Sequence, residues 1–207
     1  MVSGATFSPD GKRIVIGGAC PTPTRCDPTV SVWDLTSGRR VSELAGHTAG
    51  VNSASFSPDG KYVVTGSEDE SVRLWDLGTG QTIAQIRGYQ SGVQRTVFSP
   101  DGGLIATSSR DPVARIWVLP TSPLHATSEE DVFLLRGHTD PLASIAFSPD
   151  GRFVVTGSWD TTARVWELGG RRERVARAGS VAELLALAES RRGRTLTEEE
   201  KKRFLSE

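Results

Sequence analysis

The chain contains only two cysteines, Cys20 and Cys26, and both stand in the stretch GGACPTPTRCDPTV. Two cysteines at this spacing can form a disulfide, and as thiolates they can bind a metal ion. A structural zinc site takes four ligands, however, and only two cysteines are available. The stretch therefore has three interpretations: a loop with reduced thiols, a disulfide, or a metal site.

No other grouping of residues in the sequence is typical of an active site. There is neither a phosphate-binding glycine-rich loop with its lysine nor a nucleophile elbow. His125 lies in the segment PTSPLHATSEED and is predicted to be a solvated loop residue. Aspartate, serine and threonine recur at regular positions, whereas a catalytic set is normally unique. The sequence therefore predicts no enzyme activity, no metal and no cofactor.

The composition is that of a soluble globular protein. Hydrophobic residues make up 37%, charged residues 24%, and the formal net charge is −1, so we expect neither nucleic acid nor a membrane as partner. No run approaches the roughly 18 apolar residues of a membrane-spanning helix, and the N-terminus lacks a signal-peptide pattern. Two cysteines are too few for a disulfide scaffold, so a cytoplasmic location is expected.

Two short motifs recur along the chain and define a repeat. Copies of FSPDG follow one another at intervals of 49, 42 and 49 residues, and four tryptophans at intervals of 42, 42 and 49. The base period is therefore 42 residues, with two insertions of seven. FSPDG begins at Phe7, Phe56, Phe98 and Phe147, and the tryptophans are Trp33, Trp75, Trp117 and Trp166.

Each repeat is predicted to contain four short β-strands. In the second copy, residues 51–57 and 62–67 (VNSASFS and YVVTGS) are rich in β-branched and aromatic residues, and the SPDG between them suits a tight turn. Residues 71–77 and 82–88 (SVRLWDL and TIAQIRG) are expected to be the third and fourth strands. One such antiparallel sheet cannot bury both of its faces alone, so the repeats are expected to stack.

The repeated pattern GH…FSPDG…VTGS.D…VR.W[DE]L resembles the WD-repeat β-propeller family, in four copies over about residues 1–179. The resemblance implies an all-β fold of four propeller blades, each a four-stranded antiparallel sheet, at about 1–45, 46–87, 88–136 and 137–179. A short C-terminal tail of two helices is expected over 180–207, because Ser180 with Glu183 and Thr197 with Glu200 form capping boxes.

The resemblance also implies a structural tetrad in each blade, in which an aspartate, a histidine, a hydroxyl and a tryptophan satisfy one another. The second and fourth blades contain all four. In the third blade Tyr89 replaces the histidine, so the network is expected to be rearranged or weakened. In the first, Ile16 replaces the hydroxyl and no histidine precedes it, so this blade is expected to be the least well held. The matching residues are His47, Thr65, Asp69 and Trp75; His138, Thr156, Asp160 and Trp166; Thr107, Asp111 and Trp117; and Asp27 and Trp33.

Four blades are fewer than the roughly seven of the closed rings that the resemblance implies. Three arrangements stay open: a C-terminal piece of a longer protein with further blades upstream, which we favour; two chains that join into an eight-bladed ring; and an open arc or a ring completed by another protein. The tail is similar to the endings of large bacterial proteins, which attach WD repeats to signalling NTPase, kinase or protease-like domains.

The function that the resemblance implies is a non-catalytic scaffold for protein or peptide partners, as the sensor or partner-binding part of a larger signalling protein. The alternative is a regulatory domain of an enzyme whose catalytic part lies upstream. In the family, partners commonly meet the rim formed by the loops before the first strand and between the second and third strands. Trp159 is either a binding hot spot there or packed against the neighbouring blade or His138. The matching rim residues are Asn52, Glu68, Gln94, Arg110 and Trp159.

The cysteine stretch is a widened turn of the first repeat. From the phenylalanine of FSPDG to the tetrad aspartate there are 13 residues in the later copies, but 20 from Phe7 to Asp27. The seven extra residues fall between the second and third strands of the first blade, on the rim expected to meet partners. We expect a reduced, enlarged recognition loop there, stiffened by Pro21 and Pro23.

Overall fold

The computed structural model describes residues 2–18, 20, 27–119, 132–168 and 177–180. These residues form four antiparallel sheets of four strands each, and within each sheet the strands follow one another in chain order. No helix occurs among the described residues. Of the helical tail predicted over 180–207, Ser180 is the last residue of a strand, and residues 181–207 lie outside the described part of the chain. The predicted all-β architecture of four propeller-like blades is confirmed.

The strands have similar lengths in all four blades. The first blade comprises β1 (Val2–Phe7), β2 (Arg13–Gly18), β3 (Val30–Asp34) and β4 (Arg39–Leu44). The second comprises β5 (Val51–Phe56), β6 (Tyr62–Ser67), β7 (Val72–Asp76) and β8 (Thr82–Ile86). The third comprises β9 (Val93–Phe98), β10 (Leu104–Ser109), β11 (Ala114–Val118) and β12 (Val132–Leu135). The fourth comprises β13 (Leu142–Phe147), β14 (Phe153–Ser158), β15 (Ala163–Glu167) and β16 (Arg177–Ser180).

The SPDG motif closes the turn between the first two strands of each blade. In the second blade, the Ser57 hydroxyl donates to Oδ1 of Asp59 over 2.6 Å, and the same carboxylate oxygen accepts from the Lys61 N–H over 3.1 Å. Gly60 adopts a φ of 69°, in the left-handed region that glycine enters without a steric penalty. The motif therefore fixes the turn by local contacts, which explains why it recurs with the strands.

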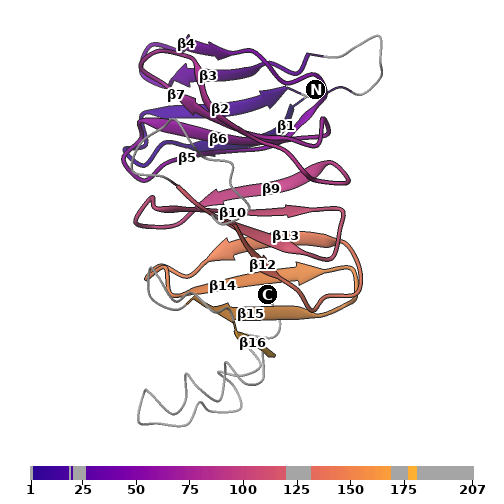
Figure 1. The fold of residues 1–207 in the computed structure, drawn as a ribbon. Coiled ribbons are helices and arrows are strands. Elements are labelled where there is room, and N and C mark those ends of the chain that lie inside the picture. Colours follow the sequence, from indigo (N-terminus) through magenta and orange to yellow (C-terminus); the bar gives the residue numbers. More distant parts are fainter. Residues whose placement is uncertain (1, 19, 21–26, 120–131, 169–176, 181–207) are drawn as a thin grey trace.

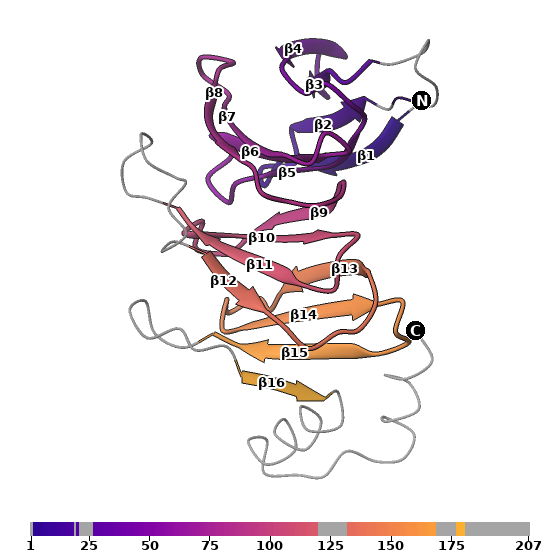
Figure 2. The same cartoon turned by 45° about the vertical axis from the view of Figure 1, so that its right-hand side comes forward.

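The four blades stack side by side along the chain, with the first blade at the top of Figure 1 and the fourth at the bottom. The first strands of successive blades lie against one another, since β1 contacts β5, β5 contacts β9, and β9 contacts β13. In the turned view of Figure 2 the stack is an open arc, and the first and fourth blades lie at its opposite ends. The described blades do not close into a ring.

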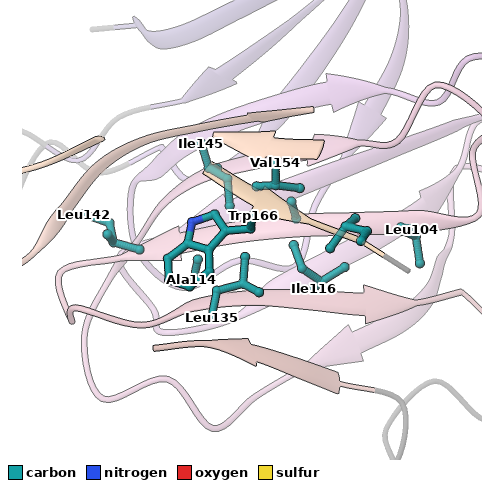
Figure 3. Close-up of a cluster of buried hydrophobic side chains, with 10 residues drawn as sticks. Leu104, Ala114, Ile116, Leu135, Leu142, Ile145, Val154 and Trp166 are labelled. Carbon is teal, nitrogen blue, oxygen red and sulfur yellow. The ribbon is translucent and has the colours of Figure 1, made fainter. Parts of the chain in front are cut away.

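The hydrophobic core lies between blades rather than within any one of them. One cluster joins Val15 of the first blade to Phe56 of the second, and another joins Val64 of the second to Ile105 of the third. The third cluster joins the third and fourth blades, and Figure 3 shows the Trp166 indole among its aliphatic side chains. Each blade is therefore stabilised by burying its faces against its neighbours.

Candidate interaction rim and the networks that support it

In the second blade, four polar side chains from different elements form one buried network. Nδ1 of His47 lies 2.8 Å from Oδ2 of Asp69, and Nε2 of His47 lies 2.7 Å from Oγ1 of Thr65. The Trp75 indole N–H donates to the same Thr65 hydroxyl over 2.8 Å. Val63 pairs with Trp75, so Thr65, two residues further along β6, faces the same side of the sheet. The alternation of the strands thus places the hydroxyl under the indole.

Asp69 anchors the network at the rim. Its carboxylate also accepts from the Thr48 N–H over 3.0 Å and from the Ser71 hydroxyl over 2.6 Å. Burial raises the pKa of Asp69, but hydrogen bonds from His47, Ser71 and Thr48 outweigh that effect and hold the pKa well below 3.8. Because an ionised carboxylate only accepts, the proton between the two groups belongs to Nδ1 of His47.

The fourth blade repeats this arrangement with nearly the same geometry. Nδ1 of His138 lies 2.7 Å from Oδ2 of Asp160, and Nε2 lies 2.8 Å from Oγ1 of Thr156. The Trp166 indole N–H donates to Thr156 over 2.9 Å. Burial raises the pKa of Asp160, but hydrogen bonds from Thr162 and His138 outweigh that effect and hold the pKa well below 3.8. This carboxylate is therefore ionised as well.

The third blade carries a rearranged network around a tyrosine. Oη of Tyr89 lies 2.7 Å from Oγ1 of Thr107, and the Trp117 indole N–H reaches both oxygens, at 2.9 Å and 3.2 Å respectively. Asp111 pairs with Arg115 instead, at 2.9 Å, and the Arg115 guanidinium lies over the Tyr89 ring at 4.8 Å. Burial raises the pKa of Tyr89, although its hydrogen bonds to Thr107 and Trp117 oppose this, so the phenol is neutral.

In the first blade the two remaining tetrad positions do not form such a network. Asp27 is exposed and accepts from the Thr29 N–H over 3.1 Å. Hydrogen bonds from the side chain and the backbone of Thr29 lower the pKa of Asp27. Trp33 is half-buried, and Ile16 offers it no hydroxyl. The hydrogen bonds of Asp27 with Thr29 are therefore local to one turn.

Three of the five predicted rim residues converge on one carboxylate oxygen of a fourth, Glu68. Oε1 of Glu68 accepts from Nδ2 of Asn52 over 2.8 Å, from Nη2 of Arg110 over 2.7 Å and from Nε2 of Gln94 over 3.4 Å. Asn52 and Glu68 belong to the second blade, whereas Gln94 and Arg110 belong to the third. We call these four residues the rim cluster, and it ties two blades together.

The rim cluster lies at the surface. Asn52 is in β5 and Gln94 is in β9, whereas Glu68 and Arg110 stand on turns that buried networks hold in place. Glu68 directly precedes Asp69, between β6 and β7, and Arg110 directly precedes Asp111, between β10 and β11. In Figure 1 the arrows of β10 and β14 point to the same side of the stack, so the turns that follow them share one edge. The Arg110 side chain is 59% exposed and that of Glu68 31%. Charged groups of both signs are therefore accessible on a fixed support.

Trp159 stands in the equivalent turn of the fourth blade, next to Asp160. Its backbone N–H donates to the Pro141 carbonyl over 3.0 Å, which ties the turn to the start of β13. The residue is 77% exposed. Trp159 therefore does not pack against His138 or a neighbouring described blade, and its indole is open to solvent.

Cys20 is disulfide-bonded. The prediction of reduced thiols is therefore wrong for this residue, while Cys26, the other cysteine of the chain, lies outside the described residues. The prediction relied on an assumed reducing compartment, whereas a disulfide needs both an oxidising environment and two sulfur atoms at bonding distance. Within the described part of the chain, no group of three or more His, Cys, Asp or Glu residues could hold a metal ion.

The sequence identified the rim residues one by one but missed their convergence on Glu68. The signal that could have shown it is the repeat itself. Glu68 and Arg110 are 42 residues apart, which is one period, so opposite charges occupy the same position in adjacent blades. Likewise, the pairing of Asp111 with Arg115 could not be foreseen from the substitution of tyrosine for histidine alone.

The repeats place the chain in a known class of protein. The family described as WD domain, G-beta repeat matches residues 38–76, 80–118 and 129–167, which is more than half of the chain. The chain therefore belongs to the WD40-repeat family. Residues 38–76 run from the turn before β4 to the end of β7, so one sequence repeat spans two blades and links them covalently. A comparison with curated proteins gave no match.

The family match bears on catalysis only in general terms. Repeats of this family are typically non-catalytic and generally mediate protein–protein interaction. Over the residues that the structure describes, no helix has the length and apolar character needed to cross a bilayer.

Proposed function

We propose that this chain is a non-catalytic scaffold that binds a protein or peptide at its rim, as the sensor or partner-binding part of a larger signalling protein. The observation that carries the proposal is the rim cluster, an accessible polar group that bridges two blades of a WD40-repeat protein. Loops held by a rigid scaffold are the usual sites of recognition.

The buried networks support this role because they fix the rim. Asp69 is tied to His47 and Ser71, and Asp111 is tied to Arg115, so the turns carrying Glu68 and Arg110 lose little further freedom on binding. The guanidinium of Arg110 favours carboxylates, which it can bind through two N–H groups at once. An acidic side chain of the partner can therefore compete with Glu68 for Arg110, while the exposed Trp159 offers an aromatic anchor on the same edge.

The test is affinity capture from cell extract with quantitative mass spectrometry. It compares the wild type with two variants, in each of which one exposed cationic side chain is replaced by alanine. Arg110→Ala removes the exposed cation of the rim, and the matched control Lys61→Ala removes an exposed cation from the turn between β5 and β6. We expect at least one protein to bind the wild type and the control but to lose about tenfold or more in capture by Arg110→Ala. Equal capture by all three chains contradicts a rim site.

A further inference from the structure

Each blade in the interior of the arc packs through two different faces. Its leading face meets the preceding blade and its trailing face meets the following one. At all three joints one trailing valine or alanine and one leading phenylalanine belong to the same hydrophobic cluster. These pairs are Val15 with Phe56, Val64 with Phe98, and Ala106 with Phe147.

The fourth pair of this series lies at the two open ends of the arc. The trailing position of the fourth blade is Val155 on β14, and the leading position of the first blade is Phe7 at the end of β1. Val155 is 40% exposed and Phe7 67%, whereas Val15 and Val64 are fully buried at internal joints. Both halves of a joint are therefore present in the chain, and neither is covered in the described structure.

The polar contacts of a joint are matched as well. Between the second and third blades, Oγ of Ser53 accepts from the backbone N–H of Thr96 over 3.0 Å and donates to its carbonyl over 3.4 Å. Ser144 occupies the place of Ser53 in the fourth blade and is exposed. Ala5 stands at the position in the first blade that Thr96 occupies in the third.

Ala5 can make the same two contacts, because both of them involve only the backbone N–H and carbonyl of Thr96. Ala5 pairs with Ile16 as Thr96 pairs with Thr107, so the backbone N–H and carbonyl of Ala5 point away from β2, as those of Thr96 point away from β10. The edge of β1 therefore presents the donor and the acceptor that Ser144 requires.

We infer that the open face of the fourth blade is a docking site for the first blade of a second copy of this chain. Two copies joined head to tail at both ends give an eight-bladed ring with two identical joints, in which no blade edge stays open. A second copy fits because this chain already forms the apolar joint three times, and forms the polar contacts of Ser53 at the joint between the second and third blades.

Two further residues gain a role in the ring. Trp75 packs against the first blade within its cluster, so Trp33, which stands at the same position and is half-buried, is covered by the partner copy. Trp159 holds the position of Glu68, whose side chain reaches Gln94 of the following blade. In the ring Trp159 therefore lies at the border between the joint and the rim.

The test is native mass spectrometry of the full chain and three glutamate variants at matched concentrations. Val155→Glu and Phe7→Glu each place a carboxylate in the joint, and Leu134→Glu is the control, because Leu134 is 41% exposed but belongs to an interior blade. We expect the wild type and the control at twice the 22.2 kDa chain mass. Each joint variant should dissociate about 100-fold more readily, since a buried unpaired charge is costly.

Mixing the two joint variants separates a head-to-tail joint from other contacts. Val155→Glu retains an intact leading face and Phe7→Glu an intact trailing face, so at a concentration where each variant alone is monomeric, the mixture should form a mixed dimer through one intact joint. Circular dichroism spectra matching the wild type show that the variants are folded. A monomeric wild type, an open ladder of larger assemblies, or a dimer that withstands Val155→Glu overturns the inference.

Discussion

Replacing the buried hydroxyl of the second blade tests the role of the tetrad most directly. Thr65→Val keeps the shape of the side chain but removes the atom that contacts both His47 and Trp75, at 2.7 Å and 2.8 Å. All three residues are buried, so the Trp75 N–H and Nε2 of His47 both lose their partner without gaining water. Each unsatisfied buried group costs about 1–3 kcal/mol, so we expect a loss of about 2–6 kcal/mol in the free energy of unfolding.

The matched substitution in the third blade, Thr107→Val, should cost less. The Trp117 N–H retains a second acceptor there, the Tyr89 hydroxyl at 2.9 Å. Only the Tyr89 O–H loses its partner, so the expected loss is about 1–3 kcal/mol. The single proton of the Thr65 hydroxyl goes to Nε2 of His47, so its 3.4 Å contact with the Arg73 carbonyl adds no further hydrogen bond. Thr107, which accepts from Tyr89, can donate to the Arg115 carbonyl over 3.3 Å, and Thr107→Val loses this weak contact as well.

Guanidinium unfolding, followed by both tryptophan fluorescence and circular dichroism, measures the two losses. The free energies can be compared only where the two probes give coincident transitions. Thr156→Val serves as a replicate, because Thr156 makes the same two contacts as Thr65, at 2.8 Å and 2.9 Å, and should cost as much. Equal losses for Thr65→Val and Thr107→Val, or a larger loss for the latter, would refute the argument that the tyrosine replaces the missing acceptor.

Two further predictions follow from the network and from the exposure of the rim. The pKa of Asp69 is depressed in the folded state, so its contribution to stability is complete above 3.8 and is lost as the pH falls through the lower folded value. The difference in stability between the wild type and Asp69→Asn should therefore shrink as the pH is lowered, in urea unfolding at a series of pH values; a constant difference contradicts this. Trp159→Ala should change the free energy of unfolding by less than about 0.5 kcal/mol, because the residue is 77% exposed. A loss above about 2 kcal/mol in the same assay would show that Trp159 is packed.

Much of the fold and of the networks can be predicted from the sequence because it depends on short-range patterns that repeat. The SPDG turn is closed by contacts between neighbours such as Ser57 and Asp59, and strand alternation places Thr65 on the face of Trp75. The same spacing in the fourth blade brings His138 to Asp160. Local turn chemistry and a period of two thus suffice to assign these positions.

The four-strand repeat, the complete networks of the second and fourth blades and the position of the rim all follow from the sequence. Three other features emerge only in the folded chain: the rim residues converge on Glu68, Arg115 pairs with Asp111, and Cys20 is disulfide-bonded. The exposure of Phe7 and Val155 to solvent is also seen only in the structure. The convergence on Glu68 and the exposure of Phe7 and Val155 depend on how the blades pack, the pairing of Arg115 on competition for one carboxylate, and the disulfide on a second sulfur atom at bonding distance. All of these are set by distances in space and not by the repeat.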